Sequence, residues 1–192
     1  MPDERCHCER CVSELATAYL GLGSNLGERE ENLCQALTLL SLKKVNLEEV
    51  SSIYETEPVP ISNRDKEQPL FLNLVCRITT NLPPEELLHL AKEIEDRMGR
   101  VPSKQINSPR PIDIDILFYD HKIMETQNLT IPHPRLPYRA FVIIPLAEIA
   151  PDLVHPKLGK SIAQLAKDVK GQEGVWKYKG GFDVSAICRR AL

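Results

Sequence analysis

Residues 70–100, LFLNLVCRITTNLPPEELLHLAKEIEDRMGR, contain the pattern of a strand followed directly by that of a helix. Over residues 70–79, successive side chains alternate between the two faces of the predicted strand. One face comprises Leu72, Leu74, Cys76 and Ile78, and the other comprises Phe71, Asn73, Val75 and Arg77. The helix follows the proline pair at 83–84, which suits a first turn, and ends at Gly99.

A second alternating stretch, IDIDILFY at 112–119, predicts another strand downstream. We expect one face to comprise Ile112, Ile114, Ile116 and Phe118, and the other to comprise Asp113, Asp115, Leu117 and Tyr119. Upstream, the patterns predict a strand at 18–22, a helix over 28–42 and a strand at 45–55. Asn25 and Glu28 resemble a capping box at the start of that helix.

The resulting order, β-α-β-β-α-β, predicts an α+β fold of the ferredoxin-like type. Such a fold has an antiparallel sheet with both helices on one face, and the apolar faces of the strands meet those helices. Phe71, Asn73, Asp113 and Asp115 therefore fall on the opposite, open face, where a ligand can reach them. After residue 120 we expect a C-terminal extension across the edge or face of this core, with a short amphipathic helix near 161–169.

The length of 192 residues predicts one domain. We expect a cysteine-rich, disordered head at 1–16, a single domain at 17–179 and a frayed tail at 180–192. A net charge of −3 argues against bulk attraction to nucleic acid or anionic lipid. The sequence also lacks an apolar stretch of the length that a membrane helix requires.

The six cysteines favour reduced thiols in the cytoplasm over a disulfide framework, since no secretory signal is visible. Three of them crowd the head as Cys6, Cys8 and Cys11, with His7 between them. This cluster is either a thiol-rich tail or a site for a soft metal, and it lacks the second CxxC of a zinc finger.

Asp113-Ile114-Asp115 is the sharpest chemical motif. Alternate residues of a strand lie on one face, about 6.5–7 Å apart along the backbone, so the two carboxylates repel each other. A Mg²⁺ ion that binds carboxylates together with substrate phosphates would remove that repulsion. The preceding segment carries Arg100, Lys104 and Arg110, which are cations of the kind that phosphoryl transfer needs. The alternative is a solvated strand face that happens to bear two aspartates.

Three further motifs have a functional and a structural interpretation. GLGSNLG at 21–27 has neither the GxGxxG spacing nor a Walker lysine, which favours a tight strand–helix turn. Asn73 and Phe71 offer an amide and a ring to a flat heterocycle, although asparagine also occurs on solvated strands. His133, which lies between two prolines, is either a phosphate contact or an ordinary loop histidine.

Together, four segments resemble the 6-hydroxymethyl-7,8-dihydropterin pyrophosphokinase family of folate biosynthesis. They are YLGLGSNLG at 19–27, FLN at 71–73, SPRPIDIDIL at 108–117, and the stretch from LTIPHPR to RAFVIIPLAEIAP at 129–151. The resemblance implies a ferredoxin-like fold over residues 17–157. It also implies transfer of the β,γ-pyrophosphoryl group of ATP to the hydroxymethyl group of the pterin, with release of AMP.

The resemblance further implies a role for each matching residue. Two Mg²⁺ ions would bind to Asp113 and Asp115, and Arg100 and Arg110 would be catalytic. The ATP-binding residues would be Glu95, Ile116, Thr130, His133 and Arg139. The pterin-binding residues would be Thr56, Pro58, Val59, Phe71, Asn73 and Phe141, with the two phenylalanines enclosing the ring. The sequence departs from the family pattern at Pro102, Asn107 and Pro134, and in the long loop at 57–69.

We therefore expect a cytoplasmic monomer that acts on two small molecules, ATP and the hydroxymethyl-dihydropterin, without a nucleic-acid or membrane partner. Two other functions stay open at this point. One is a non-catalytic ferredoxin-like module that binds RNA or regulates a partner, and an RNA-binding sheet would carry exposed aromatics and a basic surface. The other is a metal-dependent nucleotide hydrolase or nuclease, which would use the two aspartates but would not need Phe71, Asn73 and Phe141.

Overall fold

The computed structural model describes residues 15–58, 68–100 and 108–180. Its first part contains, in order, β1 (Ala16–Ser24), α1 (Arg29–Ser41), β2 (Val45–Val50), β3 (Tyr54–Thr56), β4 (Phe71–Thr80), α2 (Pro84–Arg97) and β5 (Asp113–Tyr119). Its second part contains β6 (Met124–Glu125), β7 (Thr130–Ile131), η2 (Leu136–Tyr138), α3 (Ala140–Ile149), α4 (Ile162–Asp168), η3 (Gln172–Gly174) and β8 (Val175–Lys177). The predictions for the cysteine cluster at 6–11, Val59, Pro102, Lys104, Asn107 and the tail after 180 lie outside the described residues.

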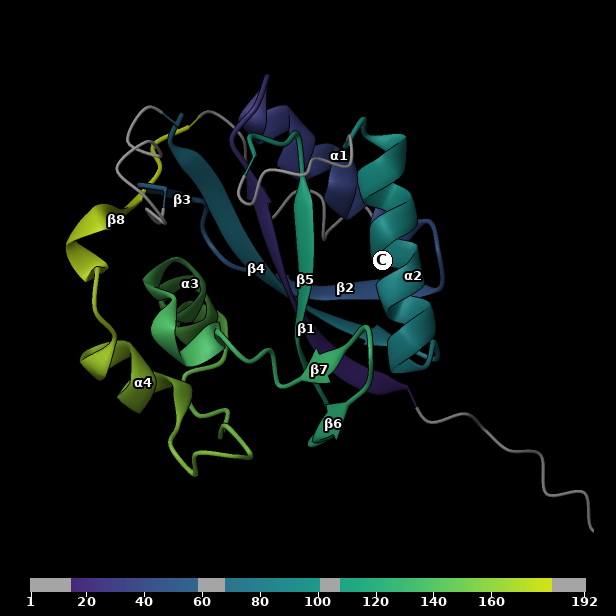
Figure 1. Ribbon diagram of the computed structural model, residues 1–192, viewed down its shortest axis with the longest axis vertical. Helices are drawn as coiled ribbons and strands as arrows, with labels where there is room; N and C mark the ends of the chain where they lie inside the picture. The colour runs from purple at the N-terminus through teal and green to yellow at the C-terminus, as the bar shows by residue number, and fades with distance from the viewer. Residues whose placement is uncertain (1–14, 59–67, 101–107, 181–192) are drawn as a thin grey trace, which may run out of the picture.

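The main sheet is antiparallel and has the strand order β5-β1-β4-β3-β8, with β2 paired to the other half of β4. Helices α1 and α2 lie on one side of this sheet, and α3 and α4 lie on the other (Figure 1). The elements up to β5 follow the predicted β-α-β-β-α-β order except that β2 and β3 are separate strands. This order and the placement of both helices on one side of the sheet confirm the predicted ferredoxin-like fold. No helix in the described part of the chain is long and apolar enough to cross a membrane.

The strand predicted at 45–55 is two strands, so that prediction was wrong in its detail. β2 pairs with residues 76–80 of β4, and β3 pairs with residues 71–73. Between them, the backbone N–H of Ser51 donates to the carbonyl oxygen of Val75, and the Ser51 hydroxyl accepts from the N–H of Val75 at 3.0 Å. A side-chain hydroxyl thus replaces one ladder bond where the two strands meet, which sequence alternation does not reveal.

The larger hydrophobic core lies between the sheet and helices α1 and α2. Its fully buried members include Leu20 and Leu22 of β1, Leu37 of α1 and Leu87 of α2. The predicted apolar face of β4, Leu72, Leu74, Cys76 and Ile78, is buried in this core as expected. Removal of this apolar surface from water is the main force that holds the helices on the sheet.

The alternation predicted for 112–119 fails at its end because β5 contains a bulge. Leu20 pairs with Ile116 while Tyr19 pairs with Phe118, so Leu117 is an extra residue in β5. Beyond the bulge the faces are exchanged. Phe118, predicted to face the helices α1 and α2, belongs to the second core, and Tyr119 belongs to the first.

The second core covers part of the face that was predicted to be open. Ile143 and Leu146 of α3 pack there with Tyr19, Val75 and Leu117 of the sheet. The expected C-terminal extension therefore lies on the sheet face, and its short helix, α4, is close to the predicted range. Because α3 covers only part of this face, it leaves a recess beside it at the end where β5 begins.

The burial of α1 leads to a prediction about stability that compares two of its leucines. Leu37 of α1 is fully buried, whereas Leu42 at the end of the helix is 72% exposed. We expect Leu37→Ala to lower the free energy of unfolding by about 2–5 kcal/mol, because it leaves a cavity. Leu42→Ala, the control, should change it by less than about 0.5 kcal/mol. Urea denaturation followed by circular dichroism measures both, and equal losses would contradict this description of α1.

Candidate active site

The recess beside α3 is a cavity of about 280 Å³ whose floor is the central strand β1. Strand register sets residues from three strands side by side across this floor. Gly23 of β1 lies between Asn73 of β4 and Asp113 of β5, and Gly21 lies between Val75 and Asp115. The prediction that the two aspartates and Asn73 share one face is therefore confirmed, and all three line the cavity.

Two of the three glycines of GLGSNLG, Gly21 and Gly23, are strand residues at this floor, so the interpretation of the whole motif as a tight turn was wrong. A Cβ atom at Gly23 would lie 2.7 Å from Oδ1 of Asn73, which is closer than atoms can approach. Among these three glycines, Gly27 alone has a positive φ, 69°, and fits the turn interpretation.

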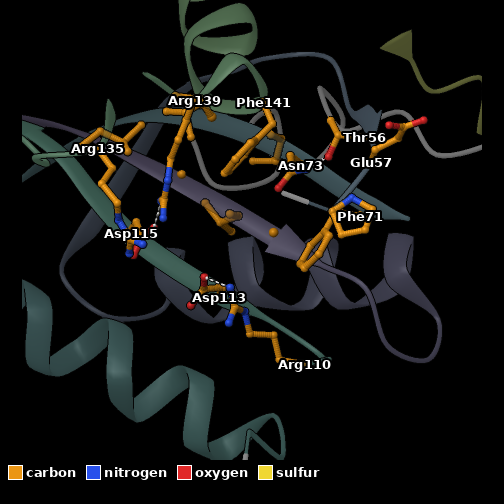
Figure 2. Close-up of a pocket in the computed structure, with 18 of the residues that line it drawn as sticks. Thr56, Glu57, Phe71, Asn73, Arg110, Asp113, Asp115, Arg135, Arg139 and Phe141 are labelled. Atoms are coloured by element: carbon orange, nitrogen blue, oxygen red, sulfur yellow. Dashed lines mark hydrogen bonds and ion pairs between the residues drawn. The ribbon is translucent and has the colours of Figure 1, made fainter. Parts of the chain in front are cut away.

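One end of the cavity is aromatic. Phe71 of β4 and Phe141 of α3 both line it, on either side of the recess in Figure 2. Between them lies Asn73, which is 6% exposed and donates from Nδ2 to Oγ1 of Thr56 at 2.8 Å. Asn73 was expected on an open face, and its burial explains why it has a protein partner. This end has the shape and polarity to hold a flat heterocycle.

The other end of the cavity holds ion pairs around the two aspartates (Figure 2). Asp113 pairs with Arg110 at 2.8 Å and with Arg100 at 2.8 Å. Asp115 pairs with Arg139 at 3.3 Å, while Nε2 of His133 lies 4.0 Å from the same carboxylate. The guanidinium groups therefore hold two adjacent negative charges in place, in an arrangement that also suits a polyphosphate.

Two of the arginines link the charged end to the aromatic end. The guanidinium of Arg110 lies over the ring of Phe71, 5.9 Å from its centroid, and that of Arg139 lies 5.4 Å from the centroid of Phe141. Arg139 and Phe141 both face the cavity, because Arg139 is the N-cap of α3 and its side chain returns over the first turn.

Burial changes the protonation of the groups beside Asp115. It lowers the pKa of His133, an effect that Asp115 partly opposes, so the imidazole is neutral at pH 7. Burial likewise lowers the pKa of Arg139, again against the influence of Asp115. Burial also tends to lower the pKa of Arg100, but the nearby carboxylates of Asp113 and Glu95 raise this pKa overall.

Glu95 lies beneath the site. Its carboxylate is 1% exposed, accepts a hydrogen bond from the backbone N–H of Ile114 at 2.7 Å, and forms ion pairs with Lys92 and Arg100. Burial raises its pKa, which these partners partly offset. Because Ile114 separates the two aspartates, Glu95 anchors the strand that carries them.

Asn25 has a structural role that differs from the predicted capping box. The N-cap of α1 is Glu28, and no side chain caps it. Instead, Oδ1 of Asn25 accepts from the backbone N–H of Arg110 at 2.8 Å, and the N–H of Asn25 donates to the carbonyl oxygen of Arg110. This reciprocal pair fixes the backbone of Arg110 at the entrance of the cavity.

The structure thus brings together most of the predicted site. The predicted residues that line the cavity are Thr56, Pro58, Phe71, Asn73, Arg110, Asp113, Asp115, Arg139 and Phe141. The others are not among the described residues that line it: Glu95, Arg100, Ile116, Thr130 and His133. Ile116 is buried in the core beneath α1 and α2, and Thr130 lies in β7. The roles predicted for these five stay predictions.

Several lining residues were missed. They include Gly21, Gly23, Glu57, Arg135 and Tyr138. Arg135 belongs to the IPHPR segment in which only His133 was selected, and its side chain points toward Asp115 in Figure 2. Arg135 is close in sequence to Arg139, which was selected, and this closeness was the signal that could have identified it. Nothing in the local sequence indicated that Tyr138, 81% exposed, borders the cavity.

The donor set at the charged end fits a magnesium ion. The described residues contain no group of three or more His, Cys, Asp or Glu side chains arranged to hold a metal. Asp113 and Asp115 instead offer two carboxylates on the wall of an open cavity, with room for further ligands beside them. Mg²⁺ uses such a partial set when substrate phosphates and water complete its coordination shell.

Comparison with known proteins gives relatives over most of the chain. It is 42% identical over 168 residues to 2-amino-4-hydroxy-6-hydroxymethyldihydropteridine pyrophosphokinase of Bacillus subtilis, covering 86% of this chain and 93% of that protein. It is 45% identical over 146 residues to folic acid synthesis protein fol1 of Pneumocystis carinii and 40% identical over 176 residues to fol1 of Schizosaccharomyces pombe, covering 76% and 91% of this chain. The chain spans 19% and 23% of the length of these two fol1 proteins.

Solved structures share the fold. The HPPK-DHPS protein of Plasmodium falciparum, crystallised as the wild type with pteroate, superposes with a TM-score of 0.67 at 16% identity, covering 85% of this chain and 48% of that one. In sequence, the family model of 7,8-dihydro-6-hydroxymethylpterin-pyrophosphokinase (HPPK) matches residues 19–151, which include both ends of the cavity. The chain therefore belongs to the HPPK family.

Proposed function

We propose that this protein transfers the pyrophosphoryl group of ATP to the hydroxymethyl group of 6-hydroxymethyl-7,8-dihydropterin and releases AMP, a step of folate biosynthesis. The observation that carries the proposal is a single cavity with an aromatic end beside a dicarboxylate–arginine end. A flat ring and a polyphosphate would lie next to each other in such a cavity. Family membership and the name of the Bacillus subtilis relative support the same reaction.

At the charged end, Asp113 and Asp115 are the residues that would hold magnesium, and we propose two ions. When bound with ATP, magnesium would neutralise charge on the phosphate oxygens and orient the triphosphate. The carboxylates are held by Arg110 and Arg139, which become available to phosphate oxygens when the aspartates bind metal. Arg135, which lines the same end, adds a further positive charge for the triphosphate.

At the aromatic end, Phe71 and Phe141 would enclose the pterin ring, and Asn73 would bind its polar edge. This places the hydroxymethyl group toward the aspartates, where its oxygen attacks the β-phosphorus of ATP. The bond from that phosphorus to the oxygen of the α-phosphate breaks, AMP leaves and a proton is released. Holding both substrates in one cavity makes this displacement effectively intramolecular.

We also infer that the protein works as a cytoplasmic monomer on small molecules and has no nucleic-acid partner. Residues of one chain form both ends of the cavity, which supports a monomer. The buried Cys34 is a free thiol, which suits a reducing compartment. Two aspartates at the exposed part of the sheet face and a net charge of −3 both disfavour RNA. We further propose the boundaries 1–16, 17–179 and 180–192 for head, domain and tail.

The experiment that tests this function is an assay of AMP release from ATP with magnesium. We expect AMP to form when 6-hydroxymethyl-7,8-dihydropterin is added, and to stay at background with ATP alone. AMP or ADP formation without the pterin would instead indicate a nucleotide hydrolase. Absence of AMP in both reactions, with ligand binding retained, would favour a binding module.

Replacement of either aspartate should abolish turnover. We expect Asp113→Asn and Asp115→Asn each to lower kcat by more than about 100-fold, because a direct metal ligand contributes more than the outer partners that cost 10–100-fold. The control is Asp120→Asn, since Asp120 follows the same strand but is exposed and outside the cavity. Steady-state kinetics at saturating magnesium and ATP measure the effect, and near-normal turnover of either variant would overturn the metal assignment.

Arg110 should act mainly in the transition state. We expect Arg110→Ala to lower kcat by about 100-fold or more, because it removes a cation from the transferred group. The dissociation constant of the pterin, measured by calorimetry, should rise far less, although Arg110 also lies over Phe71. Equal losses in kcat and in pterin affinity would show that Arg110 is a binding residue instead.

A further inference from the structure

We infer that a polar cluster outside the cavity positions two walls of its aromatic end and thereby sets the affinity of that end for a flat ring. The cluster comprises Ser52, Tyr54, Glu148 and Lys177, and we call it the Glu148 cluster. Among the described residues that line the cavity, none of these four appears, so they act as positioning residues. The inference rests on the proposed function, because the ring is the pterin of that proposal.

The carboxylate of Glu148 joins three segments of the chain. Its Oε2 accepts from the backbone N–H of Ser52 at 3.0 Å and from the hydroxyl of Tyr54 at 3.1 Å. Its Oε1 accepts from Oγ of Ser52 at 2.7 Å and from Nζ of Lys177 at 3.0 Å. Each oxygen thus accepts two hydrogen bonds, which is the full capacity of a carboxylate. One side chain of α3 therefore holds both the start of β3 and the strand β8.

The cluster is an ion pair with further hydrogen bonds to both partners. Burial tends to raise the pKa of Glu148, but the hydrogen bonds from Ser52, Lys177 and Tyr54 lower this pKa overall. Burial and the nearby Glu148 carboxylate raise the pKa of Tyr54 to about 12, so its hydroxyl keeps the proton that it donates. Nζ of Lys177 also donates to Oγ of Ser52 at 3.2 Å and lies 5.9 Å from the centroid of the Tyr54 ring.

On the β3 side, the cluster lies two residues from the cavity. Alternate residues of a strand share a face, so Tyr54, which binds Glu148, lies on the same face as Thr56, which lines the cavity. Strand β8 pairs with all three residues of β3 and sets Lys177 opposite Tyr54 and Val175 opposite Thr56. The cluster thus fixes one end of a short strand whose other end is a wall of the cavity.

On the α3 side, Glu148 follows the cavity residue Phe141 by seven positions, which is close to two helical turns. The two side chains therefore leave the helix on the same side. The start of α3 is held by the ion pair of Arg139 with Asp115 at 3.3 Å. In the proposed reaction this pair opens when Asp115 binds metal. The contacts of Glu148 are outside the cavity and would keep α3 in place at that stage.

The separation of the walls matters because a ring gains dispersion energy only from atoms that it touches. A gap of about 0.5–1 Å already forfeits a quarter to a half of the attraction of each contact. The apolar contacts that α3 makes with the sheet through Ile143 and Leu146 are non-directional. The hydrogen bonds of Glu148 are directional, so they determine how the helix lies along β3. Loss of the cluster should therefore weaken ring binding more than triphosphate binding.

The test measures binding of 6-hydroxymethylpterin by calorimetry, in the presence of magnesium and a non-hydrolysable ATP analogue. Lys177→Met and Tyr54→Phe each remove one donor and keep the bulk of the side chain, and Glu148→Gln removes the charge. We expect each to raise the dissociation constant of the pterin about three- to tenfold. The dissociation constant of the ATP analogue, and kcat at saturating substrates, should stay within about twofold. Lys177→Arg, which keeps the cation, should bind the pterin like the wild type.

A matched control removes another ion pair of the C-terminal extension. Nζ of Lys160 lies 3.0 Å from Asp168, the same distance as in the pair of Lys177 with Glu148, but this pair does not involve α3 or β3. We expect Lys160→Met to leave both dissociation constants unchanged. A rise in the pterin constant in this variant equal to that in Lys177→Met would contradict a specific role for the Glu148 cluster.

The single tryptophan of the chain gives a readout that needs no ligand. Trp176 lies in β8 opposite Glu55, is 40% exposed, and donates from Nε1 to Oε2 of Glu55 at 3.4 Å. Quenching of its fluorescence by acrylamide therefore reports whether β8 stays on β3. We expect stronger quenching in Lys177→Met and Glu148→Gln than in the wild type, and no change in Lys160→Met.

Thermal unfolding identifies any variant that does not fold, and Lys177→Met, at a side chain that is 61% exposed, then carries the comparison. Unchanged pterin affinity in the folded variants would overturn the inference, as would an equal loss of affinity for pterin and ATP analogue. If the wild type binds no pterin, the proposed function is wrong, and the Trp176 comparison still decides whether the Glu148 cluster holds β8 on β3.

Discussion

The pairing of β1 with β4 on one side and β5 on the other is the constraint on which the site depends. Its register sets Gly23 between Asn73 and Asp113, so one row of the sheet carries an amide and a carboxylate on either side of a position without a side chain. Because Gly21 and Gly23 have no side chains, the centre of the sheet face is open, and polar side chains of the neighbouring strands surround it. A shift of β1 by one residue would place Leu22 or Ser24, instead of Gly23, between Asn73 and Asp113.

Charge neutralisation is the second requirement of this arrangement. Two aspartates on adjacent rows of a partly covered sheet face are held by Arg100, Arg110 and Arg139, which come from three different parts of the chain. Of these arginines, Arg110 and Arg139 line the cavity and are the cations that we propose for the triphosphate. Beneath them, Glu95 binds Arg100 and the backbone of Ile114, so a buried charge on α2 supports the strand from the helix side. Support of this kind keeps the geometry of a site fixed when its ligands exchange.

The C-terminal extension makes a cavity from what would otherwise be a flat surface. Helix α3 buries part of the sheet face through Ile143 and Leu146, and its start carries Arg139 and Phe141 to the rim. The bulge at Leu117 contributes to this packing, because it turns both Leu117 and Phe118 toward α3. The sheet thus packs against α1 and α2 on one face and forms the cavity together with α3 on the opposite face.

Local periodicity was sufficient for the element order apart from the division of the strand at 45–55, for the two helices and for the shared face of Asn73, Asp113 and Asp115. These features depend on spacing within about ten residues, and backbone geometry converts that spacing directly into a face. The bulge in β5, the break between β2 and β3, the glycine floor and the inward position of Glu95 were decided by tertiary structure. Each depends on which strand or helix lies opposite, and register between segments far apart in sequence is set by the packing of the whole sheet.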